Sequence, residues 1–419
     1  MTPISHGAWL TWGIAGLATA GVITRPFKWP EAIWAVAGAA VIVLLGLLPL
    51  ADAWHAVGEG LDVYLFLIGM MLLSELARRE GVFDWVAAAA VRHARGSPRR
   101  LFLLVYAVGV LTTVFLSNDA TAVVLTPAVF AVAKRANAKP LPHLLVCAFV
   151  ANAASFVLPI SNPANLVLYG GHLPSLAAWL QRFAAASVCS IVVTYAALYF
   201  TQRRALRGAC ADDRSVLRLS TDGRITVIAI GVTAVVLLMV SAWDKPLGLP
   251  TAILGVCTTL GVLIRQRQSP WPVVKAIAWD VLALVAGLFV LVQTLHHTGI
   301  IQRLASGAEQ LVARWHNAAA FALGGLIAVA SNLLNNLPAG LIASATIQSD
   351  HLPQTVIDSL LIGVDLGPNL SITGSLATIL WLNSIRREGE HVGFATFLKV
   401  GICTMPPALL VALVARLWA

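Results

Sequence analysis

Charged side chains are scarce in this sequence. Asp, Glu, Lys and Arg make up 11% of its 419 residues, whereas 58% of the residues are hydrophobic and the mean hydropathy is +0.83. Soluble domains carry about 25% charged residues, so the composition excludes an ordinary soluble protein. A transmembrane helix needs about 20 apolar residues, and the length accommodates about a dozen such segments with short connections. We therefore predict a single polytopic membrane domain.

A concentrated basic surface is also missing. The net charge is +9, from 28 Lys and Arg against 19 Asp and Glu, but the basic residues form small groups between apolar runs. Nucleic-acid binding requires a solvated basic face. We therefore expect no nucleic-acid partner, and we expect the lipid bilayer to surround the chain.

Cysteines with metal-site or disulfide spacing are absent too. The sequence shows no Cys-x-x-Cys and no Cys/His ligand pattern among its five cysteines, Cys147, Cys189, Cys210, Cys257 and Cys403. Cysteine in apolar surroundings usually packs as a small hydrophobic residue, so we predict no metal site, no disulfide framework and no cofactor. The first apolar stretch, 7–23, has neither a basic leader nor a small-residue cleavage site, and is expected to be a retained span.

Apolar runs bounded by charge, Pro or Gly indicate the spans. They fall at about 7–23, 31–51, 61–77, 99–134, 141–170, 175–200, 224–242, 247–265, 277–297, 317–350, 354–385 and 393–417. Residues 201–223 form the one long polar stretch. We predict a cytoplasmic linker there, between a first repeat at 1–200 and a second at 224–419.

The distribution of Lys and Arg predicts the orientation, because cytoplasmic loops carry an excess of these residues. Of the 28 basic residues, 22 fall in one alternating set of loops, from Arg25 and Lys28 through Arg78 and Arg79 to Arg386 and Arg387. The intervening loops carry acidic residues such as Asp52, Glu59 and Asp350; Lys245, Arg303 and Arg314 are exceptions. We therefore expect a multi-pass membrane protein with both termini on the side opposite the cytoplasm.

The run 99–134 must enter and leave on one side, because basic residues flank both of its ends. Polar residues interrupt it at Ser117-Asn118-Asp119. We predict a re-entrant helical hairpin, which a membrane tolerates when its irregular tip is buried in protein or faces a watery cavity.

The second half repeats this pattern. At an offset of 218 residues Gly81 matches Gly299 and Asn118 matches Asn336, and at an offset of 212 the segment Leu158–Pro163 matches Leu370–Ser375. Each half has five crossings and one hairpin, and an odd number of crossings inverts the second half. We therefore predict an all-α membrane protein with two inverted repeats, about 10 full transmembrane helices, broken helices at 141–170 and 354–385, and re-entrant hairpins at 99–134 and 317–350. This architecture is typical of secondary transporters, which bind substrate where the repeats meet.

Four polar clusters fall at these interruptions. Their residues are Ser117, Asn118, Asp119 and Thr121; Asn332, Asn335, Asn336 and Pro338; Ser155 and 159–165; and 365–375. Pro and Gly should unwind the spans and free backbone groups, so the clusters predict a neutral cavity rich in donors and acceptors. Asn, Ser and Thr can also serve only to pack helices together. Since no Lys or Arg lies within the clusters, we expect a small hydroxylated substrate that is neutral or weakly charged, although helix N-termini alone can hold an anion.

Two carboxylates, Asp119 and Asp365, lie deep in apolar runs. A buried carboxylate is costly unless it is paired, coordinated or protonated, so each is a candidate proton carrier or cation ligand; the alternative is a structural carboxylate that caps a broken helix. Glu75 precedes Arg78 and Arg79 by one turn, which favours a membrane-edge ion pair. His296 and His297 are expected at the interface.

Four stretches resemble the ArsB-type arsenite/antimonite efflux pumps of the ion transporter superfamily. They are FLSNDATAVVLTPAV (115–129), SNPANLV (161–167), NNLPAGLI (335–342) and, most specifically, GVDLGPNLSITGSLATILWL (363–382). The similarity in length and order covers the whole chain. Family members carry Lys after Asp-Leu-Gly-Pro, where this chain has Asn369, so a role for that cation does not carry over.

The resemblance implies a secondary transporter, not an enzyme, that exports arsenite and antimonite as neutral trihydroxides by proton antiport. It implies that Asn118, Ser161, Asn162, Asn336, Thr373 and Ser375 bind the substrate and that Asp119 and Asp365 couple protons. Hydrogen bonding rather than ligation by Cys147 or Cys403 is expected, because a pump must release its cargo. A cytoplasmic arsenite-stimulated ATPase is a partner that the resemblance permits.

Other functions remain open at this point. A sodium-coupled carrier of small anions or a sodium/proton antiporter of the same superfamily would place similar Ser-Asn clusters around sodium. An intramembrane hydrolase would need a nucleophile and base or metal ligands, and no His lies in the four clusters. A passive channel would not need inverted broken repeats.

Overall fold

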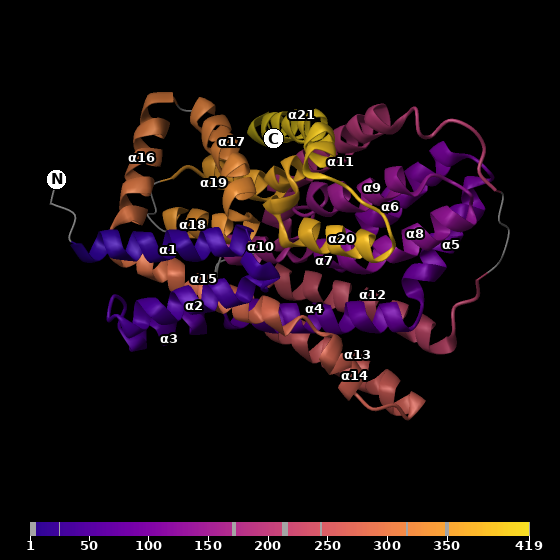
Figure 1. Ribbon diagram of the computed structural model, residues 1–419, viewed down its shortest axis with the longest axis horizontal. Coiled ribbons are helices and arrows are strands. Elements are labelled where there is room, and N and C mark those ends of the chain that lie inside the picture. Colours follow the sequence, from indigo (N-terminus) through magenta and orange to yellow (C-terminus); the bar gives the residue numbers. More distant parts are fainter. Residues whose placement is uncertain are drawn as a thin grey trace.

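The computed structural model describes residues 6–24, 26–169, 173–211, 217–243, 245–315, 317–347 and 352–418 (Figure 1). Every regular element in these ranges is a helix. Asp350 and His351, expected at the end of the second hairpin, and the basic residues Arg25 and Arg214 lie outside the described residues.

The first half runs from α1 to α11. Its elements are α1 (His6–Thr24), η1 (Pro26–Lys28), α2 (Glu31–Leu44), α3 (Leu50–Glu59), α4 (Leu61–Arg79), α5 (Val82–Ala94), α6 (Pro98–Phe115), α7 (Asn118–Ala120), η2 (Thr121–Leu125), α8 (Thr126–Arg135), α9 (Pro140–Ala153), η3 (Pro159–Ser161), α10 (Pro163–Tyr169) and α11 (Leu176–Gln202).

The second half repeats this order. It consists of α12 (Thr221–Ala242), α13 (Gly248–Gln266), α14 (Trp271–Ala276), α15 (Trp279–His297), α16 (Ile300–Trp315), α17 (Asn317–Leu334), α18 (Asn336–Ile347), α19 (Gln354–Leu366), η4 (Gly367–Leu370), η5 (Ile372–Gly374), α20 (Leu376–Arg387) and α21 (Phe394–Trp418). The starts of α4 and α15 are separated by 218 residues, as are those of α5 and α16. Gly81 and Gly299, the residues before α5 and α16, both have positive φ, which glycine adopts without steric cost.

The two halves run in opposite directions. In Figure 1, α4 leads from α3 on the left to α5 on the right, whereas its counterpart α15 leads from α14 on the right to α16 on the left. The all-helical fold with inverted repeats is thus confirmed. The division into 1–200, the linker 201–223 and 224–419 stays a prediction.

The length and hydropathy of the helices fit a multi-span membrane protein. Six described helices are long and apolar enough to cross a membrane, or seven if α3 and α4 count as one bent span. Shorter apolar helices, α9, α17 and α18 among them, belong to the hairpins and broken spans. Residues 50–59, expected to be partly a loop, instead form α3, which meets α4 at an angle of 45°.

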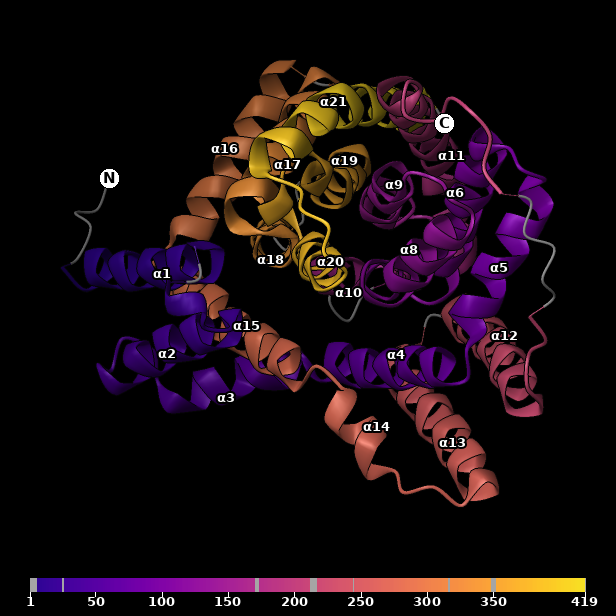
Figure 2. The same cartoon turned by 45° about the vertical axis from the view of Figure 1, so that its right-hand side comes forward.

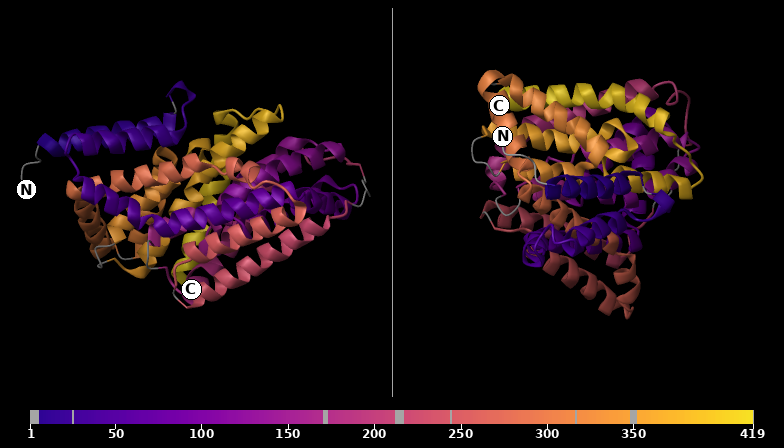
Figure 3. Two further views of the ribbon diagram at one scale, coloured as in Figure 1. Left: turned by 90° about the horizontal axis from the view of Figure 1, so that it is seen from below. Right: turned by 60° about the vertical axis from the view of Figure 1, so that its left-hand side comes forward.

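The elements gather in two groups. In Figure 2, α1–α4 and α12–α15 lie below a bundle formed by α5–α11 and α16–α21, and the right panel of Figure 3 shows the same separation from another side. In the lower group each half of the chain packs on the other. Helix α4 of the first half packs on α13 of the second, and α15 of the second half packs on α2 of the first. The candidate site lies where α4 and α15 meet the bundle.

Small residues allow the close crossing of α4 and α13. Gly69 of α4 faces the backbone of Thr251 and Ala252, and Gly255 of α13 faces the backbone of Gly69. Gly287 of α15 lies against the backbone of Ala35 in α2 in the same way. The backbones come close because no Cβ stands between them, as is common between membrane helices.

Gly69→Ala should destabilise the protein, because its Cβ would clash with the Thr251 carbonyl and force the two helices apart. We expect a loss of about 1–3 kcal/mol of stability, seen as a lower melting temperature in detergent. The matched control is Gly231→Ala in α12, where nothing lies within 4 Å of the new Cβ and Ala should be neutral or slightly stabilising. Equal melting temperatures for both variants would contradict the packing argument.

Candidate functional site

The tip of the first hairpin is an interrupted helix. After α6 ends, Ser117 adopts an extended conformation and its Oγ accepts a hydrogen bond from the backbone N–H of Ala120 at 3.2 Å. Thr113 and Thr121 join the two arms through their hydroxyls at 2.9 Å. The chain then continues through η2, a π-helical turn, of a kind that often marks functional sites. Asn118 and Asp119 are thereby placed at the very tip.

The tip of the second hairpin is built differently. Asn335 has a φ of 74°, a left-handed conformation that Asn tolerates better than most residues, and its Oδ1 accepts from the N–H of Leu337 at 3.3 Å. The helix α18 restarts at Asn336, which is buried. Asn118 and Asn336 therefore occupy equivalent positions in the two repeats.

The first broken span is held open by side chains that satisfy its backbone. Ser161 Oγ accepts from the N–H of Leu158 and donates to the carbonyl of Val114 in α6, each at 3.2 Å. Helix α11 supplies further donors to the carbonyls of Ala153 and Phe156, from Ser190, Trp179 and Ser187. Backbone groups freed by the break thus find partners inside the protein, as lipid requires.

The second broken span is fastened to the second hairpin by Asn332. The Nδ2 of Asn332 donates to the carbonyl of Gly367 at 2.9 Å, and its Oδ1 accepts from Ser371 Oγ at 2.8 Å. Thr373 Oγ1 donates to the backbone carbonyl of Asn332 at 3.1 Å. Asn332 therefore packs the helices together, which is the alternative role considered for isolated polar residues.

The breaks coincide at an offset of 213 residues, not 212. The turns η3 and η5 begin at Pro159 and Ile372, and α10 and α20 begin at Pro163 and Leu376. Asn162 and Ser375, the residues before these helices, share an extended backbone. The expected register was wrong by one residue, and Asn162 is equivalent to Ser375.

These four segments surround one small cavity. Its empty volume is about 280 Å³, including space open to solvent, and its polar lining consists of Asn118, Asp119, Asn162, Asn336 and Ser375. Apolar walls come from Leu67 of α4, Val281 of α15, and Pro163, Leu337, Leu376 and Ala377. Five of the eight predicted site residues are brought together here.

The other three predicted residues lie behind the cavity wall. Ser161 and Thr373 hold the two breaks through the hydrogen bonds described above. Asp365 is 1% exposed, and its Oδ1 accepts from Asn162 Nδ2 at 2.6 Å. Asp365 thus reaches the cavity only through Asn162.

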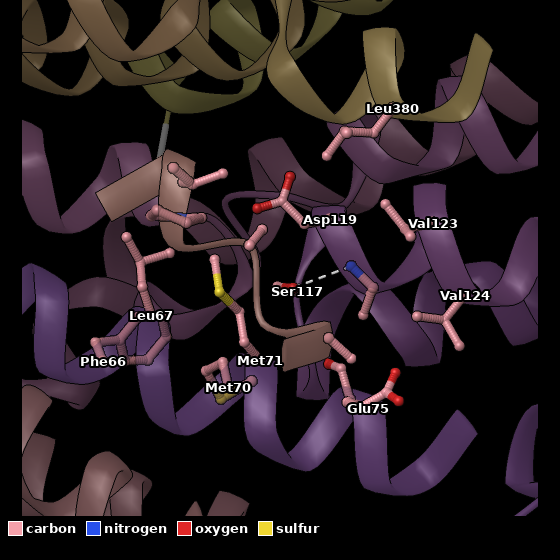
Figure 4. A pocket seen from close by; sticks show the side chains of 16 residues that line it. Phe66, Leu67, Met70, Met71, Glu75, Ser117, Asp119, Val123, Val124 and Leu380 are labelled. Carbon is pink, nitrogen blue, oxygen red and sulfur yellow. Dashed lines mark hydrogen bonds between the residues drawn. The ribbon is translucent and has the colours of Figure 1, made fainter. Parts of the chain in front are cut away.

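A larger cavity continues from the small one. It has an empty volume of about 710 Å³ and shares Leu67, Asp119, Pro163 and Val281 with the small cavity. Figure 4 shows Asp119 in the upper part of the view and Glu75 near the bottom, with Ser117 between them. No Lys or Arg is among the described residues that line either cavity.

Glu75 forms the predicted ion pair at the end of this larger cavity. Its carboxylate accepts from Nε and Nη2 of Arg78, each at 2.7 Å, and lies 3.3 Å from Nε of Arg79. The ion-pair prediction is confirmed. Because two guanidinium groups neutralise Glu75, Asp119 is the carboxylate in the cavity without a cationic partner in the described contacts.

Sequence reasoning missed the apolar walls and one buried amide. Phe66, Leu67, Met70 and Met71 of α4 line the larger cavity, but nothing distinguishes them from other apolar residues of a span. Asn152 is fully buried and donates to Asn369 Oδ1 at 3.0 Å. Asn369, at the position where the family resemblance implies Lys, donates to the carbonyl of Phe149 and lies in the wall of neither cavity.

Known bacterial proteins resemble the chain along most of its length. An arsenical pump membrane protein of Yersinia enterocolitica is 26% identical over 397 residues, covering 90% of this chain and 91% of that protein. One of Escherichia coli is 25% identical over 398 residues, with 91% and 92% coverage. An uncharacterized transporter of Mycobacterium tuberculosis is 24% identical over 383 residues, 88% of each chain. The resemblance expected from the sequence motifs is thereby confirmed.

The fold is also found in a solved structure. The YdaH transporter of Alcanivorax borkumensis, described as having an unusual topology, superposes with a TM-score of 0.59 at 17% identity, covering 99% of this chain and 98% of that chain. The sequence profile described as citrate transporter (CitMHS) matches residues 19–363. Since this match covers most of the sequence, the chain belongs to the citrate transporter family and is a multi-span membrane transporter.

Proposed function

We propose that the protein is a secondary transporter that exports arsenite and antimonite as neutral trihydroxides in exchange for protons. The observation that carries this proposal is the lining of the small cavity: three Asn amides, one Ser hydroxyl and one carboxylate, with no cationic side chain among its described residues. Amides and hydroxyls both donate and accept hydrogen bonds. Such a lining suits an uncharged solute whose O–H groups donate and whose oxygens accept.

The cysteines support hydrogen bonding rather than thiolate ligation. None of the five lines either described cavity; Cys147 is buried in the bundle and Cys403 is exposed on α21. A cargo held by amide and hydroxyl groups can dissociate readily, whereas a bond to a thiolate would retain it. The names of the Yersinia and Escherichia relatives point to the same cargo.

Proton coupling is assigned to Asp119 and Asp365. Asp119 lies in both cavities, and the larger one has a mainly apolar lining. A carboxylate without a cationic partner is costly in such an environment unless it binds a proton. A proton on Asp119 would also change the hydrogen bonds that the cavity offers to the cargo. Release of the proton and binding of the cargo can therefore be linked at one residue.

The larger cavity provides a route for loading from the cytoplasm. It extends from Asp119 to Glu75, next to Arg78 and Arg79, and the excess of basic residues assigns that side to the cytoplasm. An exporter must take up its cargo there. We place the protein in the bacterial inner membrane with both termini in the periplasm. The basic loops then lie on the cytoplasmic side, where a cytoplasmic ATPase subunit would contact them.

A second candidate function is a sodium-coupled carrier of small anions such as citrate, which the family description favours. A citrate site would have to balance up to three carboxylates, and Arg or Lys normally does so. The described lining of both cavities contains neither residue. The composition of the site therefore favours the neutral cargo.

Reconstitution tests the cargo directly. Proteoliposomes containing the protein should accumulate arsenite and antimonite when a pH gradient is imposed, and collapse of the gradient should stop the flux. Citrate, with and without sodium, serves as the comparison. Sodium-dependent citrate uptake without arsenite flux would replace the proposal with the second candidate.

Asp119→Asn should uncouple transport from protons, because the amide cannot bind a proton at this position. We expect arsenite to equilibrate across the membrane without accumulating against its gradient. Proton movement is followed with an internal pH dye alongside arsenite flux. Glu75→Gln, in the same cavity, is the matched control and should keep transport coupled to protons. Uncoupling in Glu75→Gln alone would identify Glu75 as the proton-binding residue in place of Asp119.

Asn336→Ala should weaken cargo binding, since it removes one of the two equivalent amides at the hairpin tips. Loss of a hydrogen bond of about 1–1.5 kcal/mol predicts a KM for arsenite about 5- to 12-fold higher. Asn332→Ala is the comparison: it should lower the melting temperature, because Asn332 holds the second break, with a smaller effect on KM. An unchanged KM for Asn336→Ala would remove this amide from the site.

A further inference from the structure

Both polar atoms of the Asn162 amide are held by hydrogen bonds. Its Nδ2 donates to Asp365 Oδ1 at 2.6 Å and its Oδ1 accepts from the N–H of Ala164 at 3.0 Å. An Asn side chain carries two N–H donors, and one of them is used by Asp365. Because Asn162 also lines the small cavity, these two bonds decide which amide groups remain for the cargo.

Asp365 has few alternatives to this bond. Its Oδ2 is buried without a hydrogen-bond partner in the described part of the chain. Ser155 lies beside the carboxylate, but its hydroxyl donates to the carbonyl of Asn152 at 2.8 Å. Asp365 lies on α19 of the second repeat, whereas Asn162 lies at the break of the first. The bond therefore links the two repeats next to the cavity.

The repeat-equivalent position has a neutral residue. At the offset of 213 residues Asp365 corresponds to Asn152, which is equally buried but donates to Asn369 and Thr378 instead. Neither Asn369 nor Thr378 lines a described cavity. Of the two equivalent buried residues, only Asp365 bonds to a side chain in the cavity wall.

We propose that Asp365 is a positioning residue that sets the orientation of the Asn162 amide and thereby determines cargo affinity. The amide is held so that its second N–H is available to an oxygen of the cargo. This role deepens the proposed function and rests on it for the identity of the cargo. It requires an acceptor at position 365, whether or not that acceptor is charged.

Two substitutions separate positioning from proton binding. Asp365→Asn keeps an acceptor for Asn162, so the KM for arsenite should stay within about threefold of the wild type even if proton coupling is lost. Asp365→Val removes the acceptor, so the Asn162 amide is no longer held toward the cargo and the KM should rise about tenfold. Equal KM values for the two variants would overturn the proposal.

A double variant and a matched control complete the transport test. Adding Asp365→Val to Asn162→Ala should raise the KM no further, because the positioned amide is already gone. Asn152→Val, at the repeat-equivalent position, should lower the melting temperature while leaving the KM unchanged. A further rise of the KM in the double variant, or an equal rise in Asn152→Val, would show a general packing effect and contradict the proposal.

A readout without cargo distinguishes failure of this proposal from failure of the proposed function. Infrared spectra of protein labelled with ¹³C-aspartate should contain a carboxyl band that disappears in Asp365→Asn and shifts in Asn162→Ala. If arsenite is not transported but the band shifts, the pair stands and the cargo assignment fails. If the position of the band is unchanged in Asn162→Ala, the positioning role is wrong whatever the cargo.

Discussion

The structure depends on the need to satisfy backbone polar groups where no water is available. Two spans are broken in mid-course, which frees carbonyls that lipid cannot hydrogen-bond. Side chains from neighbouring helices supply the donors: Trp179 and Ser187 to Phe156, Ser190 to Ala153, and Asn332 to Gly367. Each break can exist only because these donors are in place. Much of the polar content of this apolar chain is therefore structural.

The candidate site consists of the polar side chains that are not used to satisfy the backbone at the breaks. Ser161 and Thr373 point to the backbone and hold the breaks, whereas Asn118, Asn336 and Ser375 line the cavity. The repeats also cross at this point, because α10 packs on α18 of the other half and α20 packs on η2. Each half thus contributes one hairpin tip and one break, and the four meet around a single small space with a neutral lining.

The sequence predicts the elements that carry polar residues far better than those that do not. Polar interruptions of apolar runs revealed both hairpin tips and both breaks, since such residues are expensive in a membrane. Hydrogen bonding decides which of them face the cavity, and sequence spacing does not encode that choice for Ser161 and Asp365. Leu67 and Met70 of α4 carry no sequence signal, because an apolar residue facing a cavity resembles one facing lipid. The shift by one residue at Asn162 arose from weak side-chain similarity between the breaks.

The positions at which the two repeats carry different residues are the ones that can give the inward- and outward-facing states different energies. Inverted repeats related by a two-fold axis would give inward- and outward-facing states of equal energy if their residues matched. Asn118 and Asn336 do match, but Asp119 corresponds to Leu337 and Asp365 to Asn152. Each repeat therefore has one carboxylate at the candidate site that its partner lacks, Asp119 in the cavity lining and Asp365 bonded to Asn162. If the halves exchange conformations, these carboxylates enter non-equivalent surroundings. In the proton antiport proposed above, a proton bound to either one would then stabilise the two facing states by different amounts, as coupling requires.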